Sequence, residues 1–119
     1  MPVEPEVTAA LEKQRAVFKS LGCIVEDACP DFSGATEAFE TLRAVSFAMR
    51  YAHLLKDHRA ELKDTVIWNI EQGLALDGAR IGRAEALRTE LFQRMRRFLE
   101  KYEFLLGPAA HQDLSWQLH

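Results

Sequence analysis

The fold is decided by the stretch Gly22-Cys23-Ile24-Val25-Glu26-Asp27-Ala28-Cys29-Pro30-Asp31-Phe32-Ser33-Gly34. Gly22 suits the left-handed end of a helix because glycine has no Cβ, and Pro30 favours an extended conformation at Cys29. Residues 23–28 are therefore predicted to form a short strand between two helices. Helix, turn, strand, turn, helix is half of a βαβ crossover whose first strand is missing. The chain thus resembles a piece cut from a larger fold.

The spacing of apolar residues predicts four helices. They span about residues 5–22, 35–58, 64–76 and 79–102, and a second short strand is expected at 104–106. The fold class is then mainly α with one or two short strands (α+β), in the order helix, strand, long helix, helix, helix. Residues 1–108 form a single domain in this interpretation. Residues 109–119 show no periodicity, and we expect a poorly ordered tail there.

The second predicted helix is apolar on opposite sides between Ala44 and Leu55. A helix that is apolar all round is buried all round, and one small chain has difficulty covering both sides. We therefore predict that the chain forms a homo-oligomer, specifically a dimer. In the third helix, Trp68 points away from the side formed by Val66, Ile70 and Leu74, so it should be partly exposed or lie against a partner surface.

Composition excludes several classes of function. The chain has 119 residues, 48% of them hydrophobic and 28% charged, with a formal net charge of −3. This charge favours neither nucleic acid nor an anionic membrane, and no apolar run approaches the ~20 residues that span a bilayer. The acidic N-terminus lacks the apolar core of a signal peptide, so we expect a cytoplasmic protein. A weaker interpretation, nucleic-acid binding, would use a basic stripe on the fourth helix: Arg83, Arg94, Arg97 and Lys101.

The sequence offers no constellation of catalytic or metal-binding residues. Cys23 and Cys29 lie about 20 Å apart in an extended segment, too far for a disulfide. His53 and His58 are five positions apart, which places them on different sides of a helix. Asp31 and Ser33 are explained as candidate helix caps. We predict no metal, no cofactor and no catalytic residue in this chain.

Four segments, in their order and spacing, resemble the amidase signature family. They are Leu21–Asp31, Ala38–Ala44, Leu62–Gly73 and Phe98–Pro108. The resemblance covers about residues 3–108 and departs from the family afterwards. It implies a piece of the α/β amidase signature fold, from the C-terminal half of an enzyme that hydrolyses carboxamides.

The family's chemistry uses a lysine, a bridging serine and a nucleophilic serine, followed by an acyl-enzyme. The resemblance implies that these residues lie upstream of the part represented here, and no Gly/Ser-rich loop occurs in this chain. The chain alone should be inactive, and a small-molecule amide would be a substrate only of the full-length parent. There, Phe47 and Trp68 are expected to line the pocket. The alternative is a stand-alone helical protein–protein interaction module without enzymatic activity.

Overall fold

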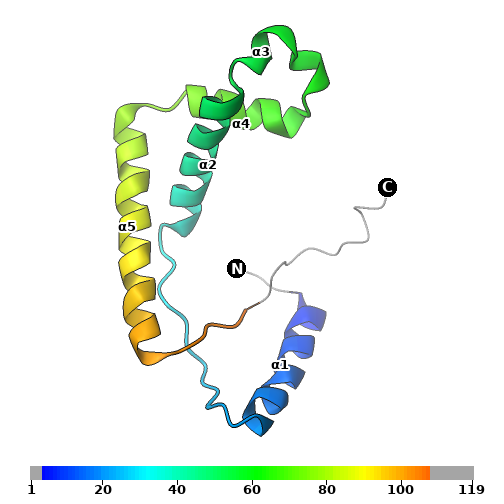
Figure 1. Cartoon of the computed structure of the whole chain (residues 1–119), viewed down its shortest axis with the longest axis vertical. Helices are drawn as coiled ribbons and strands as arrows, with labels where there is room; N and C mark the ends of the chain where they lie inside the picture. The colour runs from blue at the N-terminus through cyan, green and yellow to red at the C-terminus, as the bar shows by residue number, and fades with distance from the viewer. Residues whose placement is uncertain (1–3, 108–119) are drawn as a thin grey trace. The chain divides into compact units, whose positions relative to one another are not determined.

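A computed structural model describes residues 4–107 of the chain, which form two compact units (Figure 1). Of these described residues, one unit comprises residues 4–29 together with 102–107, and the other comprises residues 30–101. The expected tail, residues 109–119, lies outside the described residues. A single domain over residues 1–108 stays a prediction.

The first unit contains helix α1 (Pro5–Ser20), none of whose residues is buried. Pro5 stands in the first turn, and Glu6 and Lys19 complement the helix dipole at its two ends. Gly22 has φ 88°. The Gly22 N–H donates to Lys19 O (3.0 Å) and the Cys23 N–H to Phe18 O (3.1 Å), which is a Schellman end. The predicted glycine stop is therefore confirmed.

The second unit consists of helices. Their bounds are α2 (Ala35–Tyr51), α3 (Leu54–Asp57), the 3₁₀ turn η1 (Arg59–Glu61), α4 (Asp64–Leu74) and α5 (Gly78–Lys101). Helix α2 packs against both α4 and α5, and it is the central element of this unit. The third and fourth predicted helices correspond to α4 and α5 within two residues at each end.

The prediction of one or two strands is wrong for the part of the chain that the structure describes. Residues 23–28 and 104–106 are both irregular, and residues 4–107 contain no strand and no sheet. The α+β class and the α/β amidase architecture are therefore not found, although the mainly α prediction holds. A strand needs a neighbouring strand for its N–H and C=O groups. Among the described residues, no neighbouring strand covers the first of these segments, and the side chain of Ile24 within it is 90% exposed.

The second predicted helix is also too long, because α2 ends at Tyr51 rather than near His58. A turn at residues 52–53 follows, and the Leu55 N–H donates to Ala52 O at 3.2 Å. The chain then reverses through α3 and η1 so that α4 returns to pack on α2. Ala52 and His53 keep right-handed helical backbone angles, so the predicted helix is interrupted here and resumes for one turn as α3.

Small residues allow the close approach of α4 to α2. A Cβ added at Gly73 of α4 would lie 2.7 Å from the Ala44 carbonyl carbon and 2.7 Å from Ala48 Cβ, and closer still to the Ala44 oxygen. Real Cβ atoms do not approach other carbons this closely. Glycine is therefore required at position 73 by the packing of the two helices.

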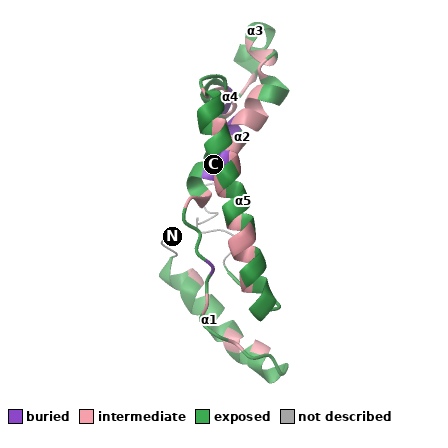
Figure 2. Ribbon diagram, turned by 90° about the vertical axis from the view of Figure 1, so that its left-hand side faces the viewer, coloured by how far each residue is buried: buried purple, intermediate pink, exposed green. Residues whose placement is uncertain are grey.

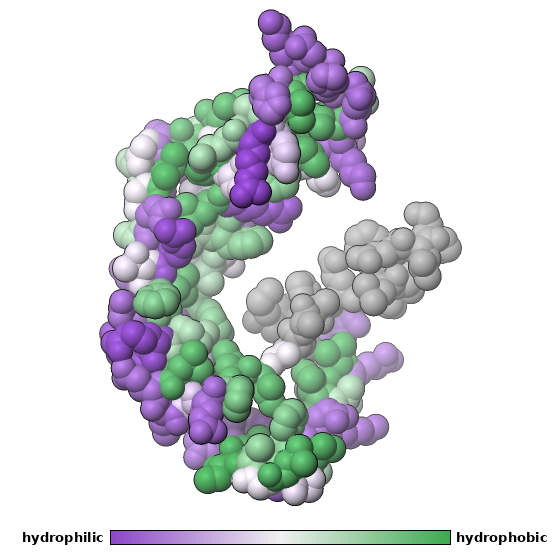
Figure 3. All heavy atoms as spheres, in the orientation of Figure 1, coloured by the Kyte–Doolittle hydropathy of each residue, from purple (hydrophilic) through white to green (hydrophobic). Residues whose placement is uncertain are grey.

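The buried core is small for a chain of this length. Among residues 4–107, the buried hydrophobic residues are Ala38, Ala44, Ile70 and Ala84. They lie on α2, α4 and α5, and exposed positions dominate the rest of these helices (Figure 2). Many large apolar side chains consequently remain in contact with water, and hydrophobic and hydrophilic residues are interspersed on the visible surface (Figure 3). Within the described residues, no helix is long and apolar enough to cross a membrane.

Candidate functional site

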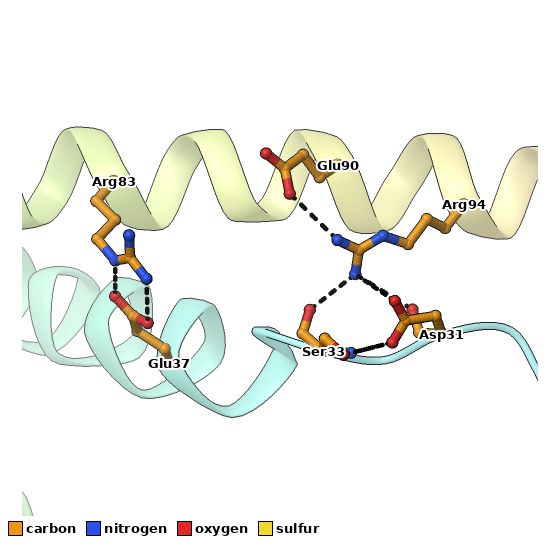
Figure 4. A network of polar contacts seen from close by, with 6 residues as sticks. All are labelled: Asp31, Ser33, Glu37, Arg83, Glu90 and Arg94. Carbon is orange, nitrogen blue, oxygen red and sulfur yellow. Dashed lines mark hydrogen bonds and ion pairs between the residues drawn. The ribbon is translucent and has the colours of Figure 1, made fainter.

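The segment before α2 is held to α5 by a polar network (Figure 4). Asp31 Oδ1 accepts hydrogen bonds from the Ser33 backbone N–H (2.8 Å) and from Ser33 Oγ (2.5 Å). Arg94 Nη1 donates to Ser33 O (2.8 Å) and forms an ion pair with Asp31 Oδ2 (3.6 Å). Glu90, one turn earlier on α5, accepts from Arg94 Nη2 at 3.2 Å. Arg94 thus anchors the entry of α2 to α5.

The predicted caps act differently from what the sequence indicated. Gly34, in a left-handed conformation (φ 83°), is the N-cap of α2, and no side chain caps the helix. Asp31 and Ser33 instead bond to each other just before the helix. The hydrogen bonds from Ser33 hold the pKa of Asp31 below its usual value. A carboxylate with a lowered pKa is a poor general base near neutral pH, so this cluster is explained as a structural turn.

A second ion pair joins α2 to α5. Arg83 on α5 donates from Nε and Nη2 to the two carboxylate oxygens of Glu37, as Figure 4 shows. The hydrogen bond to Arg83 lowers the pKa of Glu37, and the same bond raises the pKa of Arg83. Arg83 and Arg94, two members of the basic stripe predicted on the fourth helix, are therefore engaged with acidic residues. This observation removes support from the nucleic-acid interpretation.

Trp68 lies at a shallow surface hollow between α2 and α4, of about 410 Å³. The hollow is lined by Arg43, Asp64, Thr65, Trp68 and Asn69. Trp68 is 58% exposed, so the prediction that it lies outside the core is confirmed. Asn69 is buried, and its Nδ2 donates to Thr65 O at 2.7 Å.

Phe47, the other predicted pocket residue, is half-buried on α2 and is not among the residues lining this hollow. Arg43 lies between Phe47 and the hollow. Its guanidinium is 5.6 Å from the centre of the Phe47 ring, and it also lines the hollow with Trp68. The role of Phe47 and Trp68 in a substrate pocket stays a prediction. Sequence reasoning missed Arg43; the signal was its spacing of four from both Phe39 and Phe47.

The described residues contain no group of three or more His, Cys, Asp or Glu side chains that could hold a metal ion. Cys23 and Cys29 are both exposed, and no disulfide links them. His58 Nδ1 lies 2.9 Å from Glu61 Oε1, a contact within one helical turn.

Comparison with known proteins finds a partial similarity. The chain is 29% identical over 108 residues to an acylamidase from Rhodococcus erythropolis. The aligned region is 89% of this chain and 23% of the acylamidase, so the chain spans about a quarter of that protein's length. The chain resembles part of an amidase. No protein-family model matches it, and no solved structure matches it.

Proposed function

We propose that this chain is a helical segment of an amidase-like hydrolase, and that it shapes and supports the catalytic part without supplying a catalytic residue. The observation that carries the proposal is the similarity to the acylamidase, which extends over nearly the whole chain but over less than a quarter of the relative. The small core and the exposed Phe32, Met49 and Leu74 support it, because apolar surface of this kind normally lies against other protein.

The reaction of the full-length parent would be hydrolysis of a small-molecule carboxamide through an acyl-enzyme. The isolated chain would not carry it out. Ser33 is committed to Asp31 through its hydroxyl, and the lowered pKa of Asp31 leaves that carboxylate unsuited to activating a nucleophile.

The test is a chimera in which this chain replaces the aligned segment of the acylamidase. Ammonia release from a panel of simple amides is measured for the chimera, for the parent acylamidase, for the acylamidase lacking the segment, and for the isolated chain. We expect a folded, active chimera and an inactive isolated chain. A chimera as inactive as the deletion variant would refute the proposal, as would turnover by the isolated chain that Ser33→Ala or Ser46→Ala abolishes.

A stand-alone helical interaction module is the second candidate, favoured by the amount of exposed apolar surface. We also propose that the chain associates with itself as a dimer. Helix α5 offers Phe92 (64% exposed) and Leu99 (45% exposed), seven positions apart and therefore on one side. Light scattering over a dilution series tests this. A monomer mass at every concentration, with a cooperative thermal transition, would contradict it.

We place the protein in the cytoplasm as part of the same proposal. Two exposed free thiols, those of Cys23 and Cys29, favour this location, because the cytosol keeps exposed thiols reduced. Cell fractionation of the native host, probed with an antibody to the chain, tests the location.

A further inference from the structure

Helix α2 carries a ladder of side chains at four-residue spacing: Phe39, Arg43, Phe47 and Tyr51. The Arg43 guanidinium lies 5.8 Å from the centre of the Phe39 ring and 5.6 Å from that of Phe47. The Phe47 ring meets Tyr51 edge-on, with centroids 5.7 Å apart and an interplanar angle of 64°. Residues four apart lie on the same side of a helix. Arg43 is thus held between two aromatic rings, so its planar fork of N–H donors has a defined position.

The ladder is accessible to a partner. Phe39 is 62% exposed and Tyr51 39% exposed, and Arg43 is exposed as well. Arg43 also lines the hollow beside Trp68, so the ladder and the hollow share one surface. Exposed aromatic side chains around an arginine are the residue types that dominate protein interfaces.

Two arginines on this side of α2 form no ion pair within the described chain, although carboxylates lie near both: Asp64 lines the hollow with Arg43, and Glu85 of α5 lines a second hollow with Arg50. Arg50 follows Arg43 by seven residues, which places it about 10 Å further along α2 and only about 20° around it. No ion pair joins Arg43 or Arg50 to a carboxylate within residues 4–107, and Asp64 forms none although it lines the same hollow. Elsewhere in those residues, ion pairs to carboxylates are formed by Arg15, Arg59, Arg83, Arg88, Arg94 and Arg96, whereas Arg80 and Arg97 of α5 form none.

We propose that this face of α2 docks an acidic amphipathic helix from another polypeptide. Two carboxylates of the partner, two helical turns apart, bind Arg43 and Arg50. Apolar side chains between them contact Phe47 and Trp68. An arginine held by stacking loses little conformational freedom when it binds a carboxylate in bidentate fashion, and complementary charge selects the partner and its register.

The charges disfavour two other occupants. A second copy of the chain packed on this face about a two-fold axis would bring the same surface onto itself. Arg43 and Arg50 would then face the equivalent arginines, and like charges repel. Single-stranded nucleic acid stacks on aromatic residues too, but its affinity rests on neutralising many phosphates. Two arginines in a chain of net charge −3 do not supply that.

The test uses the full-length chain with Trp116→Phe, so that Trp68 is the sole fluorophore of its kind. The probe is a 20-residue helical peptide of Leu and Ala. It carries two glutamates, seven positions apart, on the side of the helix that is to contact α2. A matched peptide carries glutamine at the same positions, and a dT oligonucleotide is titrated as a third probe. Trp68 emission and calorimetry report binding. Arg43→Ala and Arg50→Ala are compared with Arg97→Ala, an exposed arginine on α5 that changes net charge equally.

We expect the glutamate peptide to bind and the glutamine peptide to bind at least tenfold more weakly. Each of Arg43→Ala and Arg50→Ala should weaken binding about fivefold, as expected for a solvent-accessible charge pair worth about 1 kcal/mol, and Arg97→Ala should have no effect. Arg50 makes no ion pair in the folded chain, so its variant stays informative if Arg43→Ala unfolds. Equal binding of the two peptides, equal effects of Arg97→Ala and Arg50→Ala, or tighter binding of the oligonucleotide would each overturn the proposal.

Discussion

Replacement of Gly73 by alanine tests the packing of α4 on α2. The new Cβ would meet Ala44 backbone atoms and Ala48 Cβ at 2.7 Å or less, whereas carbon atoms in contact prefer about 3.5–4.0 Å. Helix α4 must therefore move away from α2 by about 1 Å, because a backbone carbonyl cannot turn aside as a side chain can. Overpacking of this kind costs about 1–3 kcal/mol. The higher helix propensity of alanine returns about 1 kcal/mol of that.

The matched control is Gly82→Ala, within α5, where an added Cβ meets nothing within 4 Å. Gly82→Ala gains the higher helix propensity of alanine without a steric clash. It should therefore be more stable than the natural chain by about 0.5–1 kcal/mol. We expect the two variants to differ by about 2 kcal/mol in the free energy of unfolding. Urea denaturation followed by far-UV circular dichroism measures the difference. Gly73→Ala as stable as Gly82→Ala would refute the argument that close backbone contact requires glycine.

Two further predictions concern the polar network and Trp68. The pKa values of Asp31 and Glu37 in the folded chain lie below their ordinary values of 3.8 and 4.5. Their contribution to stability is therefore complete above the ordinary values, and it is lost as the pH falls through the folded-state values. The urea midpoint should therefore drop between neutral pH and about pH 3, and less so in the Asp31→Asn, Glu37→Gln double variant; an unchanged pH profile in that variant would contradict this. Acrylamide should quench Trp68 in the Trp116→Phe chain nearly as well as it does free tryptophan, because the side chain is 58% exposed; strong protection at high dilution would contradict this.

The helices could be predicted because their signals are local. Leu74, predicted on the same side as Ile70, is 60% exposed, but the other local features hold. Pro5 marks the start of α1 and Gly22 its end, and the spacing of Val66 and Ile70 indicates the covered side of α4 and the exposed position of Trp68. These features depend on neighbours within a few residues. Sequence reasoning placed them correctly for that reason.

The prediction of a strand at residues 23–28 was wrong because strand formation depends on a partner strand elsewhere in the chain. A short extended segment followed by a proline does not reveal whether such a partner exists. The end of α2 at Tyr51 was missed for a similar reason. The chain leaves α2 there so that α4 can pack on it, and this packing depends on the distant contact between Gly73 and Ala44. The contact of Arg94 with Ser33 joins residues 61 positions apart. No local pattern in the sequence announces it.

The alanine-rich core has a calorimetric consequence. Alanine methyl groups bury little apolar area, and the heat capacity increment of unfolding rises with that area by roughly 0.45 cal/mol/K per Å². The isolated chain should therefore unfold with a low heat capacity increment for its length, and the plot of its free energy of unfolding against temperature should be only weakly curved. Covering Phe39, Tyr51 and Trp68 with a partner removes apolar area from water at the moment of association, which gives a negative heat capacity change of binding. A small part of the heat capacity change that a chain of this length ordinarily shows on folding would thus be measured when it binds.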